Sequence, residues 1–129
     1  MQTEVKTAKP RILVVDDEAI LALSTAKDLE RAGFEVVATA RSVTRALAVI
    51  AQVACDAAVL DVHLGKETSE PIAQELKFRG VPFVVVSGYS RSQIPPSMDD
   101  APMLSKPIKV AALVAALNDS LSVSRLRSS

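Results

Sequence analysis

The sequence predicts an α/β fold in which a parallel sheet lies between two layers of helices. Two observations support this prediction: short apolar runs alternate with amphipathic stretches, and the alternation repeats five times. Continuous runs rich in β-branched residues are typical of strands buried on both faces, as in a parallel sheet. A chain of 129 residues is long enough for one domain with one core. We therefore expect a doubly wound sheet joined by right-handed crossovers.

The predicted strands are the five apolar runs at 12–15, 34–38, 57–60, 83–86 and, more weakly, 102–104. The first helix is predicted from apolar residues three or four apart and a terminating glycine, namely Ala19, Leu23, Ala26, Leu29 and Gly33. Ser42 and Ser69 are candidate N-caps of the second and third helices, and Gly80 would end the third. The last helix has the clearest stripe, formed by Val110, Leu113, Val114, Leu117 and Leu121.

Residues 91–100 form the weakest part of this pattern. They contain two prolines and few apolar side chains, so the fourth helix is expected to be short or irregular. Flexible tails are expected at residues 1–10 and 122–129, which leaves residues 11–121 as the folded domain.

The composition argues against several classes of protein. Fifteen basic and fifteen acidic residues cancel and aromatic residues make up only 3 %, which disfavours binding to nucleic acid. The one cysteine, Cys55, cannot form an internal disulfide, so we interpret it as a buried structural thiol in a reducing compartment. No apolar run approaches the ~18 residues of a membrane span, and the N-terminus lacks the core of a signal peptide. A cytoplasmic location is therefore expected.

Polar residues follow four of the five predicted strands. Asp16 and Asp17 follow the first strand, Asp61 the third, Ser87 the fourth and Lys106 the fifth. The carboxyl ends of parallel strands meet at one edge of a sheet, where ligands of such folds bind. Any one of these residues alone is most simply a turn or cap residue, but their joint placement predicts a site.

The predicted site has an unbalanced charge. Two like charges about 4 Å apart repel by ~4 kcal/mol at an effective dielectric constant of about 20. Either a carboxyl pKa rises or a divalent cation enters, and an all-oxygen site with an open side suits Mg²⁺. Mg²⁺ and Lys106 would also attract a phosphoryl group, which a carboxylate can accept as a nucleophile.

These residues resemble the receiver domain of two-component response regulators, over roughly residues 11–121. The motifs are Val14-Val15-Asp16-Asp17-Glu18, Leu60-Asp61-Val62, Val86-Ser87-Gly88 and Ser105-Lys106-Pro107. The resemblance implies a flavodoxin-like fold with the strand order 2-1-3-4-5. The runs Val62-His63-Leu64-Gly65 and Ser87-Gly88-Tyr89 are similar to a single-domain subgroup with a Phe-Ala-Thr-Gly-Tyr signature after the fourth strand.

The resemblance implies a phosphoacceptor with a Mg²⁺ site. Asp61 matches the phosphoacceptor, Asp17 the direct metal ligand, and Asp16 the acid that holds a metal-bound water. The remaining protein ligand is the backbone carbonyl of His63, whose side chain could tune phosphate loss. Gly65 occupies a position where the family usually has proline, so this loop is expected to be more mobile.

The resemblance also implies a switch. Ser87 matches the hydroxyl that moves toward the phosphoryl group, and Lys106 matches the lysine that pairs with it. The peptide bond between Lys106 and Pro107 is usually cis in the family. Met103 stands where most receivers have an aromatic switch residue, and Tyr89 is a candidate replacement.

The expected function is therefore a phosphoacceptor switch and not a turnover enzyme. A sensor histidine kinase would donate the phosphoryl group to Asp61 in a Mg²⁺-dependent reaction, and the domain would catalyse both this transfer and its own slow dephosphorylation. No pattern of a further domain follows residue 121, so we expect output through a downstream protein, a histidine phosphotransferase or a phosphate sink. Neither nucleic-acid binding nor membrane insertion is expected.

Two alternatives remain open from the sequence. A small Mg²⁺-dependent phosphatase also forms an aspartyl phosphate, but it typically has a second Asp two residues after the nucleophile, where this chain has His63 after Asp61. A receiver-shaped binding module that is never phosphorylated usually lacks one of the acids or the lysine, all of which are present here.

Overall fold

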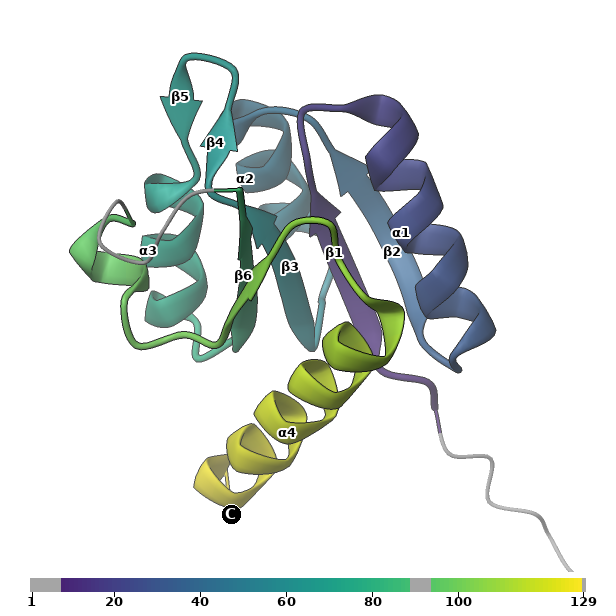
Figure 1. Ribbon diagram of the computed structural model, residues 1–129. Helices are drawn as coiled ribbons and strands as arrows, with labels where there is room; N and C mark the ends of the chain where they lie inside the picture. The colour runs from purple at the N-terminus through teal and green to yellow at the C-terminus, as the bar shows by residue number, and fades with distance from the viewer. Residues whose placement is uncertain (1–7, 89–93, 129) are drawn as a thin grey trace, which may run out of the picture.

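Five parallel strands form the central sheet of the computed structural model, which describes residues 8–88 and 94–128. They are β1 (Arg11–Val15), β2 (Glu35–Ala40), β3 (Ala57–Asp61), β6 (Phe83–Ser87) and β7 (Met103–Ser105). Across the sheet they follow the order β2-β1-β3-β6-β7 (Figure 1). Numbered among these five strands alone, this is the predicted order 2-1-3-4-5, so the predicted fold class is confirmed.

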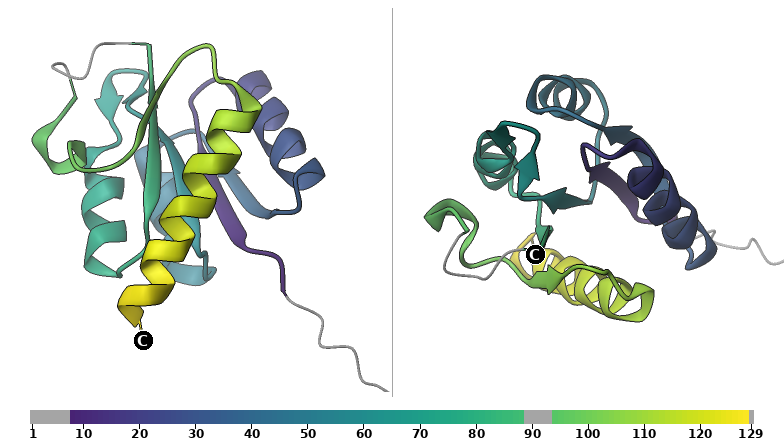
Figure 2. Two further views of the ribbon diagram at one scale, coloured as in Figure 1. Left: turned by 60° about the horizontal axis from the view of Figure 1, so that its bottom comes forward. Right: turned by 45° about the horizontal axis from the view of Figure 1, so that its top comes forward.

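Four α-helices cover the two faces of this sheet within the described residues. They are α1 (Ala19–Arg31), α2 (Val43–Gln52), α3 (Glu70–Phe78) and α4 (Val110–Ser128). Figure 2 shows α1 and α4 on one face and α2 and α3 on the other. None of the helices in the described part of the chain is long and apolar enough to cross a lipid bilayer.

Alternation along β1 divides the apolar core into two clusters. Leu13 and Val15 pack into the cluster on the α2–α3 side, whereas Ile12 and Val14 belong to the cluster on the α1–α4 side. Successive side chains of a strand point to opposite faces, so both faces of a central strand must be apolar. Every residue of β3 and of β6 is buried, which explains why these strands appear as unbroken apolar runs in the sequence.

The helix ends follow the predicted capping residues in most cases. Ser42 caps α2, where its Oγ accepts a hydrogen bond from the Arg45 N–H at 3.2 Å. Gly33 and Gly80 follow α1 and α3 with φ values of +101° and +71°, which glycine adopts without steric cost. Ser69 occupies the N-cap position of α3, but its fully buried hydroxyl donates to the Met98 sulfur at 3.8 Å and makes no cap bond.

The orientation of α1 differs from the predicted stripe. Its buried residues are Ala22, Ala26 and Leu29, whereas Leu23 is 55 % exposed and Ile20 is 82 % exposed. The helix therefore buries two alanines together with Leu29 and leaves the larger Ile20 and Leu23 outside. Periodicity could not separate these two orientations, because α1 carries apolar residues on both sides.

The described part of the connection between β6 and β7, which comprises residues 88 and 94–102, is irregular, as predicted. Among residues 94–102, only Pro96–Met98 are helical, and they form a single 3₁₀ turn. The Ser97 hydroxyl donates to Glu70 Oε2 at 2.7 Å, and Lys77 Nζ lies 3.0 Å from Asp100 Oδ1. This turn is thus attached to α3.

Two features lie outside the sequence prediction. A second sheet of two antiparallel strands, β4 (His63–Leu64) and β5 (Glu67–Thr68), follows β3 directly. In addition, α4 continues to Ser128, so residues 122–128 are helical and the predicted boundary at 121 is not a helix end. No glycine or proline lies between residues 111 and 129 to stop the helix.

At the N-terminal end of the domain, residues 8–10 precede β1 without regular structure, and the remainder of the predicted N-terminal tail lies outside the described residues.

Candidate acid site at the carboxyl edge of the sheet

The register of the strands brings the predicted polar residues to one edge. Val15 of β1 pairs with Leu60 of β3, so Asp16 and Asp61 leave the sheet at the same level. Asp61 also pairs with Val86 of β6, one residue before Ser87. The prediction that these strand ends converge is therefore correct in its geometry.

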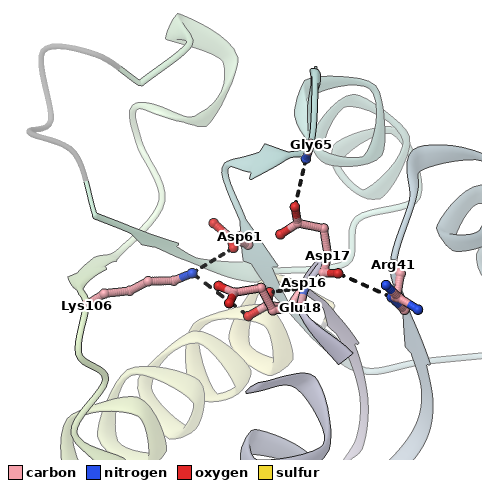
Figure 3. Close-up of polar contacts among 7 residues, drawn as sticks. All are labelled: Asp16, Asp17, Glu18, Arg41, Asp61, Gly65 and Lys106. Carbon is pink, nitrogen blue, oxygen red and sulfur yellow. Dashed lines mark hydrogen bonds and ion pairs between the residues drawn. The ribbon is translucent and has the colours of Figure 1, made fainter. Parts of the chain in front are cut away.

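Three carboxylates and one ammonium meet at this edge, and we call this group the acid site (Figure 3). One oxygen from each of Asp16, Asp17 and Asp61 lies within 4.8 Å of the others. Lys106 Nζ donates to Asp61 Oδ2 at 2.8 Å and lies 4.0 Å from Asp16 Oδ2. Asp16 and Asp61 are each only 6 % exposed, so their charges are poorly solvated.

Burial and neighbouring charges shift two pKa values in the acid site. Burial raises the pKa of Asp16, and the charges of Asp61 and Asp17 raise it further, against the Glu18 backbone hydrogen bond and the Lys106 charge. For Lys106, burial lowers the pKa, but the hydrogen bond to Asp61 and the nearby carboxylates outweigh it, so the pKa is raised. The surroundings of Lys106 therefore favour its protonated form, and those of Asp16 make its carboxyl harder to ionise than a solvent-exposed one.

Backbone groups hold the acids of the β1–α1 turn in place. The Glu18 N–H donates to Asp16 Oδ1 at 2.9 Å, and the Gly65 N–H donates to Asp17 Oδ2 at 2.9 Å. Arg41 Nε donates to the backbone carbonyl of Asp17 at 3.2 Å (Figure 3). The turn is therefore fixed from β2, through Arg41, and from the β4–β5 hairpin, through Gly65.

The donor set of the acid site fits a divalent cation. Its convergent groups are all carboxylate oxygens, which hard cations such as Mg²⁺ and Ca²⁺ prefer. Three carboxylates beside one ammonium leave two negative charges in excess, which one divalent cation would neutralise. Asp16, Asp17 and Asp61 are therefore the residues that could hold such an ion.

Ser87 and the β7–α4 turn lie next to the acid site. Ser87 is 1 % exposed and pairs with Ser105 of β7, and the Lys106 N–H donates to its carbonyl at 3.0 Å. The peptide bond between Lys106 and Pro107 is cis. These contacts place the Ser87 backbone and the lysine side by side at the ends of neighbouring strands.

The other residues singled out in the sequence are distributed differently. Met103 is half-buried in β7 opposite Val85 and packs against the core cluster on the α2–α3 side. His63 is half-buried in β4 and pairs with Thr68 of β5, so it belongs to a strand where the sequence suggested a loop. Tyr89 lies outside the described residues. The switch roles expected for Met103, His63 and Tyr89 remain predictions.

Cys55 lies apart from the acid site, just before β3. It is half-buried, packs against the core cluster on the α2–α3 side, and has a free thiol. Burial raises its thiol pKa, with a further contribution from Asp56. A thiol with a raised pKa is a weak nucleophile at neutral pH, which agrees with a structural role.

Sequence reasoning did not anticipate Gly65 and Arg41 as contacts of Asp17. A signal for Gly65 was present, because a two-residue turn that begins with glycine is typical of tight β-hairpins. Arg41 gave no such signal, since an arginine that follows a strand is usually a solvated surface residue.

A doubly wound sheet with buried acids and one lysine at its carboxyl edge defines a signalling domain of the receiver class. The model of the family described as response regulator receiver domain matches residues 12–118, and the chain belongs to this family.

Three known proteins illustrate the similarity. The transcriptional regulatory protein PdtaR of Mycobacterium tuberculosis is 27 % identical over 97 % of this chain, which spans 62 % of the length of PdtaR. The solution structure of SdrG from Sphingomonas melonis Fr1 is 36 % identical, covers 90 % of this chain and 98 % of its own, and has a TM-score of 0.77. A Burkholderia pseudomallei response regulator, solved with a phosphorylated aspartic acid, a calcium ion and citrate, is 25 % identical, covers 94 % of this chain and 74 % of its own, and has a TM-score of 0.76.

Proposed function

We propose that this chain is a phosphoacceptor switch in which Asp61 accepts a phosphoryl group from a histidine kinase in a Mg²⁺-dependent reaction. The observation that carries the proposal is the pairing of Asp61 with Lys106 at 2.8 Å inside a cluster of three carboxylates. Membership of the receiver family supports it, as does the phosphorylated aspartic acid in the Burkholderia pseudomallei relative.

The groups at the edge of the sheet suit transfer to a carboxylate. An oxygen of Asp61 would attack phosphorus while the bond to the donor nitrogen breaks, and the donor imidazole, protonated at its other ring nitrogen, would leave as the neutral base. Lys106 pairs with Asp61 in the unmodified protein, and after the transfer its ammonium would pair with a negatively charged phosphoryl oxygen. A Mg²⁺ ion held by Asp16, Asp17 and Asp61 would offset the remaining negative charge of the phosphoryl group.

Ser87 is the residue best placed to report the modification. Its buried position at the end of β6 is next to Lys106 and one register step from Asp61. A phosphoryl group adds strong acceptor oxygens that a nearby hydroxyl can bond. Movement of Ser87 would repack the side chains around the end of β6, and the altered face would bind a downstream protein or a histidine phosphotransferase.

The test is phosphorylation by a small donor, with acetyl phosphate and Mg²⁺ and detection by intact-mass analysis. We expect one added phosphoryl group on the wild type and none on Asp61→Asn, and a phosphorylated histidine kinase should give the same pattern. EDTA should abolish the modification. A wild-type protein that binds Mg²⁺ but is never modified would overturn the proposal and favour a receiver-shaped binding module.

A further inference from the structure

The β4–β5 hairpin stands directly beside the acid site. Its two-residue turn consists of Gly65 and Lys66, because Leu64 pairs with Glu67 on either side of them. The Ser69 N–H donates to the Val62 carbonyl at 2.8 Å and closes the base of the hairpin. Leu64 is 3 % exposed, which anchors the first strand in the core cluster on the α2–α3 side. The turn itself is exposed, so its position depends on few contacts.

One of those contacts is made with the acid site itself. The Gly65 N–H donates to Asp17 Oδ2 at 2.9 Å across 48 positions of sequence. Figure 3 shows the other oxygen of Asp17 turned toward Asp61. The amide therefore holds one oxygen of the carboxylate while the second oxygen faces the other acids.

We infer that Gly65 is a positioning residue for Asp17, and that a cation in the acid site and the β4–β5 hairpin stabilise each other. The inference rests on the proposed function, which gives Asp17 the role of a metal ligand. Carboxylates that bind metals are usually oriented by a second hydrogen bond, and removal of that partner typically weakens metal affinity about 10–100-fold. The coupling is reciprocal by thermodynamic necessity, so the cation must also strengthen the hold of Asp17 on the hairpin.

The backbone conformation of Gly65 explains why this contact needs glycine or a close substitute. Its φ is +64°, in the left-handed region that most side chains disfavour. Proline cannot adopt this angle and has no N–H to donate. Asparagine tolerates the left-handed region and retains the N–H. No neighbouring heavy atom lies within 4 Å of the place where a Cβ would stand, so asparagine has room.

The matched pair Gly65→Pro and Gly65→Asn tests the contact, because proline removes both the N–H and the positive φ that directs it, whereas asparagine retains both. We would measure Mg²⁺ binding by isothermal titration calorimetry with no phosphoryl donor present. Gly65→Pro should weaken the affinity by about 10–100-fold, whereas Gly65→Asn should stay within about threefold of the wild type. Equal affinities in a folded Gly65→Pro protein would overturn the inference.

Amide hydrogen exchange in the wild type provides a second test that needs no substitution. Saturating Mg²⁺ should slow exchange of the Gly65 amide. The Gly80 amide is a matched control, because Gly80 also has a positive φ and its N–H donates to the Lys77 carbonyl at 3.1 Å, far from the acid site in sequence and fold. An unchanged rate at Gly65, or equal slowing at Gly80, would contradict the coupling.

The outcomes also separate this inference from the proposed function. If the wild type binds no Mg²⁺, the metal part of the proposed function fails and the inference fails with it. If the wild type binds Mg²⁺ and is phosphorylated at Asp61, but Gly65 responds neither to substitution nor to the ion, only the inference fails.

Discussion

The interior of the sheet and its carboxyl edge are built from adjoining residues of the same strands, but they differ in what they contribute. Leu60 is fully buried among apolar side chains. Asp61, the next residue of β3, is 6 % exposed, and its carboxylate pairs with Lys106 at 2.8 Å. One step along the strand thus changes a favourable burial into a costly one. Burial of the apolar interior stabilises the fold. The buried charges at the edge lower this stability, but they form a site that can bind a ligand.

The largest effect on stability is expected in the interior. Leu60→Ala should lower the free energy of unfolding by about 2–5 kcal/mol, because it leaves a cavity in the core cluster between the sheet and helices α2 and α3. The matched control is Leu23→Ala on α1, where the side chain is 55 % exposed, and its loss should be within about 0.5 kcal/mol. Urea unfolding of both variants measures the difference. Similar losses would show that Leu23 is buried after all.

A smaller effect is expected when the counter-charge at the edge is removed. Without divalent ions, Lys106→Met should destabilise the protein by about 1–3 kcal/mol, because Asp61 is then buried without its partner. Solvent reduces this effect, since the Lys106 side chain is 26 % exposed.

Lys109→Met, at an exposed position of the same turn, is the control and should change little. The double variant Lys106→Met with Asp61→Asn should recover part of the loss, as a double-mutant cycle would show. A Lys106→Met protein as stable as Lys109→Met would mean that the pair contributes nothing to the fold.

The smallest effect is expected to have the opposite sign. Burial raises the pKa of Asp16, so the folded protein binds a proton more tightly than the unfolded chain, and this group's contribution to stability falls as the pH rises through its pKa. At neutral pH in EDTA, Asp16→Asn should therefore stabilise the protein by about 0.5–2 kcal/mol. The asparagine oxygen can still accept the Glu18 N–H.

Thermal unfolding in EDTA and in Mg²⁺ checks this prediction. Mg²⁺ should raise the melting temperature of the wild type more than that of Asp16→Asn. A variant that is less stable than the wild type in EDTA would contradict the view that the charged edge costs stability.

The contrast between the apolar interior of the sheet and its charged carboxyl edge also explains what could be predicted from the sequence. Strands buried on both faces produce unbroken apolar runs, and the rule that parallel strands end at one edge brought Asp16, Asp61 and Lys106 together without tertiary information. The stripe of α4 was equally clear, because Leu113, Leu117 and Leu121 are buried at helical spacing.

The remaining features depend on contacts between distant segments. The orientation of α1 was decided by how closely Ala22 and Ala26 approach the sheet, which periodicity alone does not reveal. The β4–β5 hairpin has only two residues in each strand, too few for an alternating pattern to be recognised. The contact of Gly65 with Asp17 joins residues 48 positions apart, so it appears only in the folded chain.

The most direct test of the central claim is to locate the phosphoryl group on the chain. After treatment with acetyl phosphate and Mg²⁺, borohydride reduction converts an aspartyl phosphate into homoserine, which marks the modified residue. Trypsin should release residues 46–66, which contain both Asp56 and Asp61, and residues 12–27, which contain Asp16 and Asp17. Fragment-ion sequencing of these peptides should find homoserine at residue 61 alone. Homoserine at another acid, or at none in a protein that binds Mg²⁺, would contradict the assignment of Asp61 as the phosphoacceptor.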